Sequence, residues 1–299
     1  MHGHDPDVFR GGRPKGWNPG DNEPVPDNER NAVNGARLVF VGGLHRSGTT
    51  PLSRALATHP SISGLRDTGV TEDEGQHLQS VYPKAGRYGG PGRFALSPQA
   101  HLTEDSPLVT PENADRLVRE WLPYWDDSRE LLLEKSPPNL VMGRFLQALF
   151  PGSALVVVLR HPVVVALSTV KWRRFASRHW WKHASVPDMV RHWFTAHDLL
   201  RQDAAHLSRL HVLRYEDLLA DPVGRLAEIQ HFLGLETPFQ ADYLRPGHST
   251  QYEERWAAMQ RSLLSGPTRR RVENAYGDAA ARYGYDISDL SVREPWSLA

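Results

Sequence analysis

A short apolar run, a glycine-rich loop and a helix-forming segment follow one another near the start of this chain and limit what it can fold into. The run covers residues 38–42, the loop is Gly43–Thr50 (Gly-Leu-His-Arg-Ser-Gly-Thr-Thr), and residues 49–58 are expected to be helical. Such a loop and the first turn of the helix after it expose backbone N–H groups, which bind anions. We therefore predict a phosphate or sulfate site here, in preference to a strand–helix turn without a ligand.

The loop differs from that of nucleotide triphosphatases in one respect. A Walker loop reads G-x-x-x-x-G-K-[ST], with its Lys on the β- and γ-phosphates and its Ser or Thr on magnesium. Here Thr49 occupies the Lys position and the basic residue is Arg46. Arg46 offers a fork of donors suited to phosphate or sulfate oxygens, and Ser47, Thr49 and Thr50 add hydroxyls. The loop therefore predicts that a nucleotide is bound without the lysine and magnesium contacts of a triphosphatase.

The rest of the chain alternates strand-like and helix-like segments. This order predicts an α/β fold, with a mostly parallel central sheet flanked by helices and ligands bound at the carboxyl ends of the strands. We expect one domain over residues 36–299, preceded by a flexible leader over residues 1–35. The expected strands are 38–42, 130–133, 154–159 and 211–214; the expected helices are 49–58, 111–125, 139–150, one beginning after His161-Pro162, 187–208 and 222–232, with a further helix considered at 73–82 and an irregular surface segment at 82–97.

Composition excludes several classes of function. The 35 basic and 35 acidic residues cancel, which argues against a general nucleic-acid binder, and the absence of cysteine excludes thiolate chemistry. No apolar run approaches the roughly 20 residues that span a bilayer, and the N-terminus lacks the apolar core of a signal peptide. We expect a cytoplasmic protein without a membrane span. His2 and His4 are expected to be chance histidines, not a metal site.

A second anion site is predicted where the strand over residues 154–159 ends. Triphosphatases often place a magnesium-binding Asp at the end of such a strand, whereas this strand ends in Arg160, with Ser168 about two helical turns beyond. An Arg and a Ser in this arrangement suit a separate phosphate. Alone, Arg160 would be read as a surface residue; beside the glycine loop it indicates a nucleotide with two anionic groups.

These motifs together resemble the sulfotransferase superfamily that uses 3′-phosphoadenosine-5′-phosphosulfate (PAPS), in particular the branch of tyrosylprotein and heparan-type enzymes and their bacterial relatives. The resemblance covers most of residues 37–286 and implies a P-loop-like nucleotide-binding fold, PAPS as co-substrate and no metal. It implies that Arg160 and Ser168 bind the 3′-phosphate and that Tyr215 lines the nucleotide site. The residues that it assigns to the 5′-phosphosulfate are Arg46, Ser47, Gly48, Thr49 and Thr50.

The resemblance also suggests catalytic residues. Lys135 stands where the tyrosylprotein branch has a lysine that supports the leaving phosphate, and an ammonium group there stabilises the charge that develops on the bridging oxygen. Arg46 is expected to assist. Glu74, followed by Gln76, matches the pattern that heparan-type relatives use for the general base. Asp67 and His77 remain alternatives for the base.

The acceptor is less constrained by the sequence. The basic and aromatic residues 171–183 are interpreted as an acceptor wall, with a nucleic-acid or membrane surface and ordinary packing as alternatives. Ser249 and Arg255 are weaker candidates for contacts to the 3′-phosphate and adenine. The sequence favours sulfuryl transfer to a hydroxyl, rather than an amine, of a small molecule, lipid or glycan, and makes no prediction of oligomeric state. The alternatives are a P-loop nucleotide kinase or hydrolase and a non-catalytic nucleotide-binding module.

Overall fold

The computed structural model describes residues 34–176, 185–242, 244 and 250–298. Within them, five parallel strands form one sheet in the order β2-β3-β1-β4-β5. The strands are β1 (Leu38–Gly43), β2 (Ile62–Gly64), β3 (Leu131–Lys135), β4 (Ala154–Leu159) and β5 (Leu210–Arg214). The predicted α/β fold with a parallel central sheet is confirmed. Almost all of the predicted leader lies outside the described residues.

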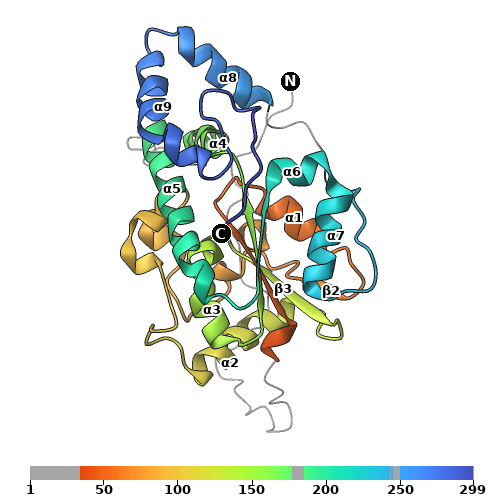
Figure 1. Cartoon of the computed structure of the whole chain (residues 1–299). Helices are drawn as coiled ribbons and strands as arrows, with labels where there is room; N and C mark the ends of the chain where they lie inside the picture. The colour runs from red at the N-terminus through yellow and green to blue at the C-terminus, as the bar shows by residue number, and fades with distance from the viewer. Residues whose placement is uncertain (1–33, 177–184, 243, 245–249, 299) are drawn as a thin grey trace, which may run out of the picture.

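Helices cover both faces of this sheet (Figure 1). On one face, α1 (Thr49–Leu56), α6 (Tyr215–Ala220) and α7 (Pro222–Leu233) bury apolar side chains against β1, β3 and β4. The other face carries a larger core built around Phe40 and Trp121. Its helices are α2 (Pro111–Trp121), α3 (Gly143–Leu149), α4 (Pro162–Ala176) and α5 (Val186–Asp203), with α8 (Thr250–Arg261) and α9 (Gly266–Ala281) packed on α4 and α5.

The register of the central strands determines where the site can form. Every residue of β1, β3 and β4 is buried, so these strands carry apolar side chains on both faces of the sheet. Val41 of β1 lies opposite Lys135 of β3 and Val156 of β4. The carboxyl ends of the three strands, and the polar residues that follow them, therefore meet along one edge of the sheet.

Several predicted elements differ in the structure. Residues 73–82 form no α-helix but short 3₁₀ turns, Thr71–Asp73 and Gly75–His77, and both Glu72 and Asp73 have positive φ. The segment 82–97 is not confined to the surface, because Tyr82, Phe94 and Ala95 are buried. The helix expected over 139–150 is a 3₁₀ turn (Pro137–Val141) followed by α3. β2, α6, α8 and α9 were not predicted; β2 has only three residues and shows no usable periodicity.

The free energy of unfolding is expected to depend on pH because two histidines are buried beside the larger core. Burial lowers the pKa of His161 and of His197 from 6.5 to about 4. The unfolded chain therefore takes up these protons at a higher pH than the folded chain does. The free energy of unfolding should fall as pH drops from about 6.5 toward 4, by up to about 3 kcal/mol for each histidine.

His197→Phe should keep the ring that stacks on Trp193 at 3.9 Å and remove one of the titrating groups. Urea denaturation between pH 4 and 7 should show a shallower loss of stability in this variant than in the wild type. His206→Gln, an exposed substitution, serves as the control. Equal pH dependence in wild type and His197→Phe would contradict the assignment.

Candidate active site

The glycine loop after β1 has the geometry of an anion cradle. Gly48 caps the start of α1 with a φ of 106°, and Arg46 also has a left-handed φ of 73°. A Cβ atom on Gly48 would lie 2.3 Å from Cδ2 of Tyr215, so only glycine fits beneath that ring. The hydroxyl of Ser47 is fully buried and has no hydrogen-bond partner among the described residues. A buried hydroxyl without a partner at the mouth of such a loop suits an anionic oxygen.

The structure brings the three predicted nucleotide motifs together. Arg46 donates from Nε to Oγ of Ser168 on α4 at 3.1 Å, and Arg160 donates from Nη1 to the backbone oxygen of Arg46 at 3.1 Å. The guanidinium carbon of Arg160 lies 4.8 Å from the ring centroid of Tyr215. The loop, the end of β4, the buried face of α4 and the end of β5 thus form one continuous site with two arginines.

These arginines are not equally exposed. Arg160 is buried, and burial lowers the pKa of its guanidinium, while the nearby Glu216 raises it and Arg46 lowers it further. The guanidinium still carries its charge at neutral pH, because arginine stays protonated in proteins. Two like charges in one partly buried site repel each other, and a bound anion would relieve that repulsion.

A second group of residues fixes the backbone on which Arg160 stands. His161 donates its backbone N–H to Glu216 Oε1 at 2.9 Å, and Tyr285 donates its hydroxyl to Glu216 Oε2 at 3.0 Å. Trp193 of α5 donates its indole N–H to the carbonyl of Arg160 at 2.8 Å. Burial raises the pKa of the Glu216 carboxyl and lowers that of His161. The ends of β4 and β5 are therefore held against the C-terminal segment at the point where Arg160 and Tyr215 emerge.

Lys135 and Glu74 form a buried ion pair beside the loop. Lys135 is the last residue of β3, and its Nζ lies 3.2 Å from Glu74 Oε1. The other oxygen of Glu74 accepts a hydrogen bond from Gln76 Nε2 at 2.6 Å. Both charged side chains are less than a tenth exposed. A carboxylate and an ammonium group out of bulk water next to an anion cradle are suited to proton transfer and charge stabilisation.

Glu134 holds the segment that carries Glu74, a role that the sequence did not suggest. Its carboxylate accepts hydrogen bonds from the Gly75 amide at 3.0 Å, the Ser136 hydroxyl at 2.5 Å and the Asn139 amide at 2.6 Å. Burial raises the pKa of this carboxyl to about 7, against the opposing effect of the donors Ser136 and Asn139. A Cβ on Gly75 would lie 2.5 Å from Glu134 Cγ, so this contact requires glycine. The pattern Glu-Gly-Gln at 74–76 is thus explained by its anchorage to β3.

His45 is a further site residue that sequence reasoning missed. It stands in the loop directly before Arg46, and the charges of Glu74, Lys135, His77 and Arg46 all act on it. Burial is the largest cause that lowers its pKa to about 4, so the imidazole is neutral at pH 7. Its Nδ1 is buried and has no hydrogen-bond partner among the described residues. Its position inside the glycine loop, directly before Arg46, was the available signal.

The two alternatives for the base lie in different surroundings. Asp67 is exposed and has a positive φ of 55°. His77 is about a third exposed, and its Nε2 lies 3.6 Å from Glu74 Oε2. Burial lowers the pKa of His77, with Glu74 opposing that effect. Of the three candidates, Glu74 is the one paired directly with Lys135.

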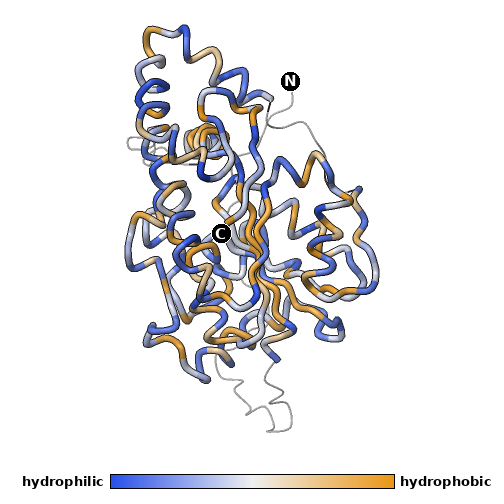
Figure 2. The backbone as a smooth tube through the Cα atoms, in the orientation of Figure 1, coloured by the Kyte–Doolittle hydropathy of each residue, from blue (hydrophilic) through white to orange (hydrophobic). Residues whose placement is uncertain are grey.

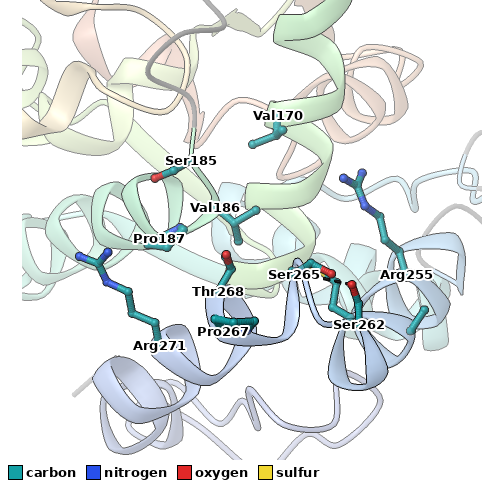
Figure 3. Close-up of a pocket in the computed structure, with 12 residues that line it drawn as sticks. Val170, Ser185, Val186, Pro187, Arg255, Ser262, Ser265, Pro267, Thr268 and Arg271 are labelled. Carbon is teal, nitrogen blue, oxygen red and sulfur yellow. Dashed lines mark hydrogen bonds between the residues drawn. The ribbon is translucent and has the colours of Figure 1, made fainter.

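The remaining predicted residues lie partly or wholly away from this cluster. Residues 177–184, in the acceptor wall, and Ser249 are outside the described residues; Trp172 on α4 is half-exposed. Arg255 lines a pocket of about 730 Å³ between α4, α5, α8 and α9 (Figure 3), and none of the clustered site residues lines it. Within the described part of the chain, no group of three His, Asp or Glu residues could hold a metal ion. No helix described here is both long and apolar enough to cross a membrane.

Comparison with known proteins agrees with these motifs. Residues 39–239 match the model of the family described as the sulfotransferase family. A protein-tyrosine sulfotransferase 2 from Gallus gallus is 23% identical over 200 residues, covering 66% of this chain and 51% of the relative. An omega-hydroxy-beta-dihydromenaquinone-9 sulfotransferase from Mycobacterium bovis is 27% identical over 168 residues, covering 53% of this chain and 42% of the relative.

The chain thus spans about half the length of the curated relatives it matches. Among solved structures, the crystal structure of sulfotransferase STF1 from Mycobacterium tuberculosis H37Rv superposes with a TM-score of 0.45 at 18% identity, covering 74% of this chain and 76% of that one. The family match covers about two thirds of the sequence, from β1 past α7, and includes every motif of the site. The chain therefore belongs to the sulfotransferase family, as the resemblance of its motifs predicted.

Proposed function

We propose that this protein transfers a sulfuryl group from PAPS to a hydroxyl group of a small molecule, lipid or glycan. The observation that carries the proposal is the buried Lys135–Glu74 pair, which lies beside the glycine loop that contains Arg46 and accepts a hydrogen bond from Arg160. A donor with a 5′-phosphosulfate and a 3′-phosphate needs two cationic sites and no cation on a γ-phosphate. Family membership supports a sulfuryl donor, and the loop with Thr49 in place of lysine disfavours a kinase.

In this proposal the loop amides, the Ser47 hydroxyl and Arg46 bind the 5′-phosphosulfate. Arg160 and Ser168 bind the 3′-phosphate, and Tyr215, packed on Gly48, lines the nucleotide site. The unpartnered Ser47 hydroxyl and the Tyr215 ring that only Gly48 can accommodate are features that fit such a ligand. Thr49 and Thr50 add hydroxyls at the first turn of α1.

The transfer step is an in-line displacement at sulfur. The acceptor oxygen forms the new S–O bond while its proton passes to the Glu74 carboxylate, and the S–O bond to the 5′-phosphate breaks. The electron pair of that bond stays on the phosphate oxygen, where Lys135 and Arg46 stabilise the negative charge. The products are the sulfate ester and 3′-phosphoadenosine 5′-phosphate (PAP). Gln76 and Glu134 keep Glu74 in place for the proton transfer.

A hydroxyl acceptor is favoured over an amine by the relatives. The two curated relatives are named for tyrosine and for an omega-hydroxy menaquinone, both of which offer a hydroxyl. A carboxylate base paired with a lysine suits removal of a proton from a neutral hydroxyl as it attacks. The proposal therefore places the acceptor hydroxyl within reach of Glu74.

Substitution of Arg160 tests the nucleotide assignment. Arg160→Ala should weaken PAP binding by roughly ten- to hundredfold, because a charge-assisted contact to phosphate is lost. Adenosine 5′-phosphate, which lacks the 3′-phosphate, should bind the variant and the wild type with nearly equal affinity. Isothermal titration calorimetry with both nucleotides measures the difference. Arg191→Ala, an exposed arginine of α5, is the matched control; an equal loss for both nucleotides would contradict the role of Arg160.

Substitution of Glu74 tests the base. Glu74→Gln should lower kcat by about 10²- to 10⁴-fold while PAP affinity stays unchanged, because the amide keeps its size but accepts no proton. The measurement is transfer of ³⁵S-sulfate from PAPS to a panel of phenols and primary alcohols. Glu72→Gln, on an exposed carboxylate two residues away, is the control.

Asp67→Asn tests the alternative assignment, in which Asp67 is the general base. It should leave kcat unchanged if Glu74 is the base. Full activity of Glu74→Gln together with an inactive Asp67→Asn would transfer the role to Asp67. Tight PAP binding by the wild type without transfer to any acceptor, at a rate that Glu74→Gln does not change, would instead indicate a binding module.

A further inference from the structure

The turn between α8 and α9 presents two leucines to solvent. Leu263 is 96% exposed and Leu264 is 95% exposed, the highest values among the exposed large apolar side chains of the described residues. The turn forms an outer corner of the molecule at the top of Figure 1, and Figure 2 shows an orange stretch there between more hydrophilic segments. Two adjacent leucines fully in water at a projecting corner serve no purpose in the core of this chain.

The part of the hairpin nearest these leucines is rich in arginine, although the chain as a whole has no net charge. Residues 255–272 contain five arginines and no aspartate or glutamate, whereas Glu253, Glu254, Glu273 and Asp278 lie farther from the turn on the same two helices. Arg269 is buried and pairs with Glu273 of its own helix at 2.6 Å. The other four, Arg255, Arg261, Arg270 and Arg271, are exposed, and within the part of the chain that the structure describes none of them forms an ion pair.

Hydrogen bonds anchor the hairpin that presents the two leucines to solvent. Arg269 donates to the carbonyls of Trp256 at 2.7 Å and Ser288 at 2.9 Å, which ties α9 to α8 and to the C-terminal segment. In the turn, Gly266 donates its N–H to the Ser262 carbonyl at 2.8 Å. The exposed position of Leu263 and Leu264 is therefore a property of an anchored turn.

A pocket opens beside the same turn. Ser262 and Ser265, which flank the two leucines, also line the 730 Å³ pocket between α4, α5, α8 and α9. Figure 3 shows Arg255 and Arg271 on opposite sides of it, with Val170 and Val186 on the side of α4 and α5. Hydroxyls and arginines around an apolar interior suit an anionic head group attached to an apolar chain.

We propose that the α8–α9 hairpin docks on an anionic lipid surface. Leu263 and Leu264 enter the boundary between head groups and acyl chains, and the four exposed arginines contact lipid phosphates, one of which the pocket receives. Two exposed leucines with exposed arginines on both adjoining helices are complementary to such a surface in both polarity and charge. A projecting corner suits a lipid layer better than a folded protein partner, which would need a matching cavity.

Vesicle co-sedimentation of the full chain tests the proposal. Vesicles of equimolar phosphatidylcholine and phosphatidylglycerol should bind the protein, vesicles of phosphatidylcholine alone should bind it weakly, and added salt should reduce the binding. Leu263→Ser with Leu264→Ser, and separately Arg270→Glu, should each lower the partition coefficient by about tenfold or more.

Matched substitutions elsewhere serve as controls. Val223→Ser on α7 replaces another exposed apolar residue, and Arg116→Glu on α2 reverses another exposed arginine; neither should change the partition coefficient. Circular dichroism melting and PAP binding should be the same in all variants, which separates loss of docking from loss of folding or of the nucleotide site. The proposal would be overturned if the wild-type protein did not bind anionic vesicles. It would also be overturned if the hairpin variants bound them as well as the wild type does. A concentration-dependent dimer that the leucine variant abolishes would overturn it too, since that would assign the turn to a second copy of the chain.

Discussion

The buried ion pair between Lys135 and Glu74 is the interaction on which the arrangement of the site depends. Removing two charges from water costs several kcal/mol per ion, and only good geometry with further hydrogen bonds offsets that cost. Gln76 bonds the free oxygen of Glu74, and Glu134 anchors the intervening Gly75 to β3. The irregular segment at 71–77 is therefore shaped by the need to bring one carboxylate back onto the end of a central strand.

Two like charges meet on the side of the site that we propose binds the nucleotide. Arg46 and Arg160 converge through a backbone hydrogen bond, Ser168 and Tyr215, although their positive charges repel. The clamp of His161, Glu216 and Tyr285 fixes the strand end that bears Arg160. Two arginines that lie this close at the ends of parallel strands suit an anionic ligand, which is consistent with membership of the sulfotransferase family.

Much of this could be predicted from sequence because strong local signals coincided with buried strands. The glycine loop, Arg160 and Tyr215 each follow an apolar run, and parallel strands bring such positions to one edge. The predicted secondary structure was wrong where tertiary contacts determine the backbone conformation. Residues 73–82 contain helix-forming side chains, yet the carboxylate of Glu134, 59 residues away, accepts the Gly75 amide, and the segment forms 3₁₀ turns instead of an α-helix. His45 was overlooked because its partners come from other segments, and the α8–α9 hairpin because its apolar face packs on helices distant in sequence.

We propose that the loop and Arg160 together select a nucleotide with a 5′-anionic group and a 3′-phosphate. Calorimetric titration of the wild-type protein with PAP and with ATP, each in the presence of EDTA and then of magnesium, tests it most directly. PAP is expected to bind equally well in both media and more tightly than ATP in either. Magnesium-dependent binding of ATP that is tighter than the binding of PAP would contradict this proposal and would favour a nucleotide kinase or hydrolase.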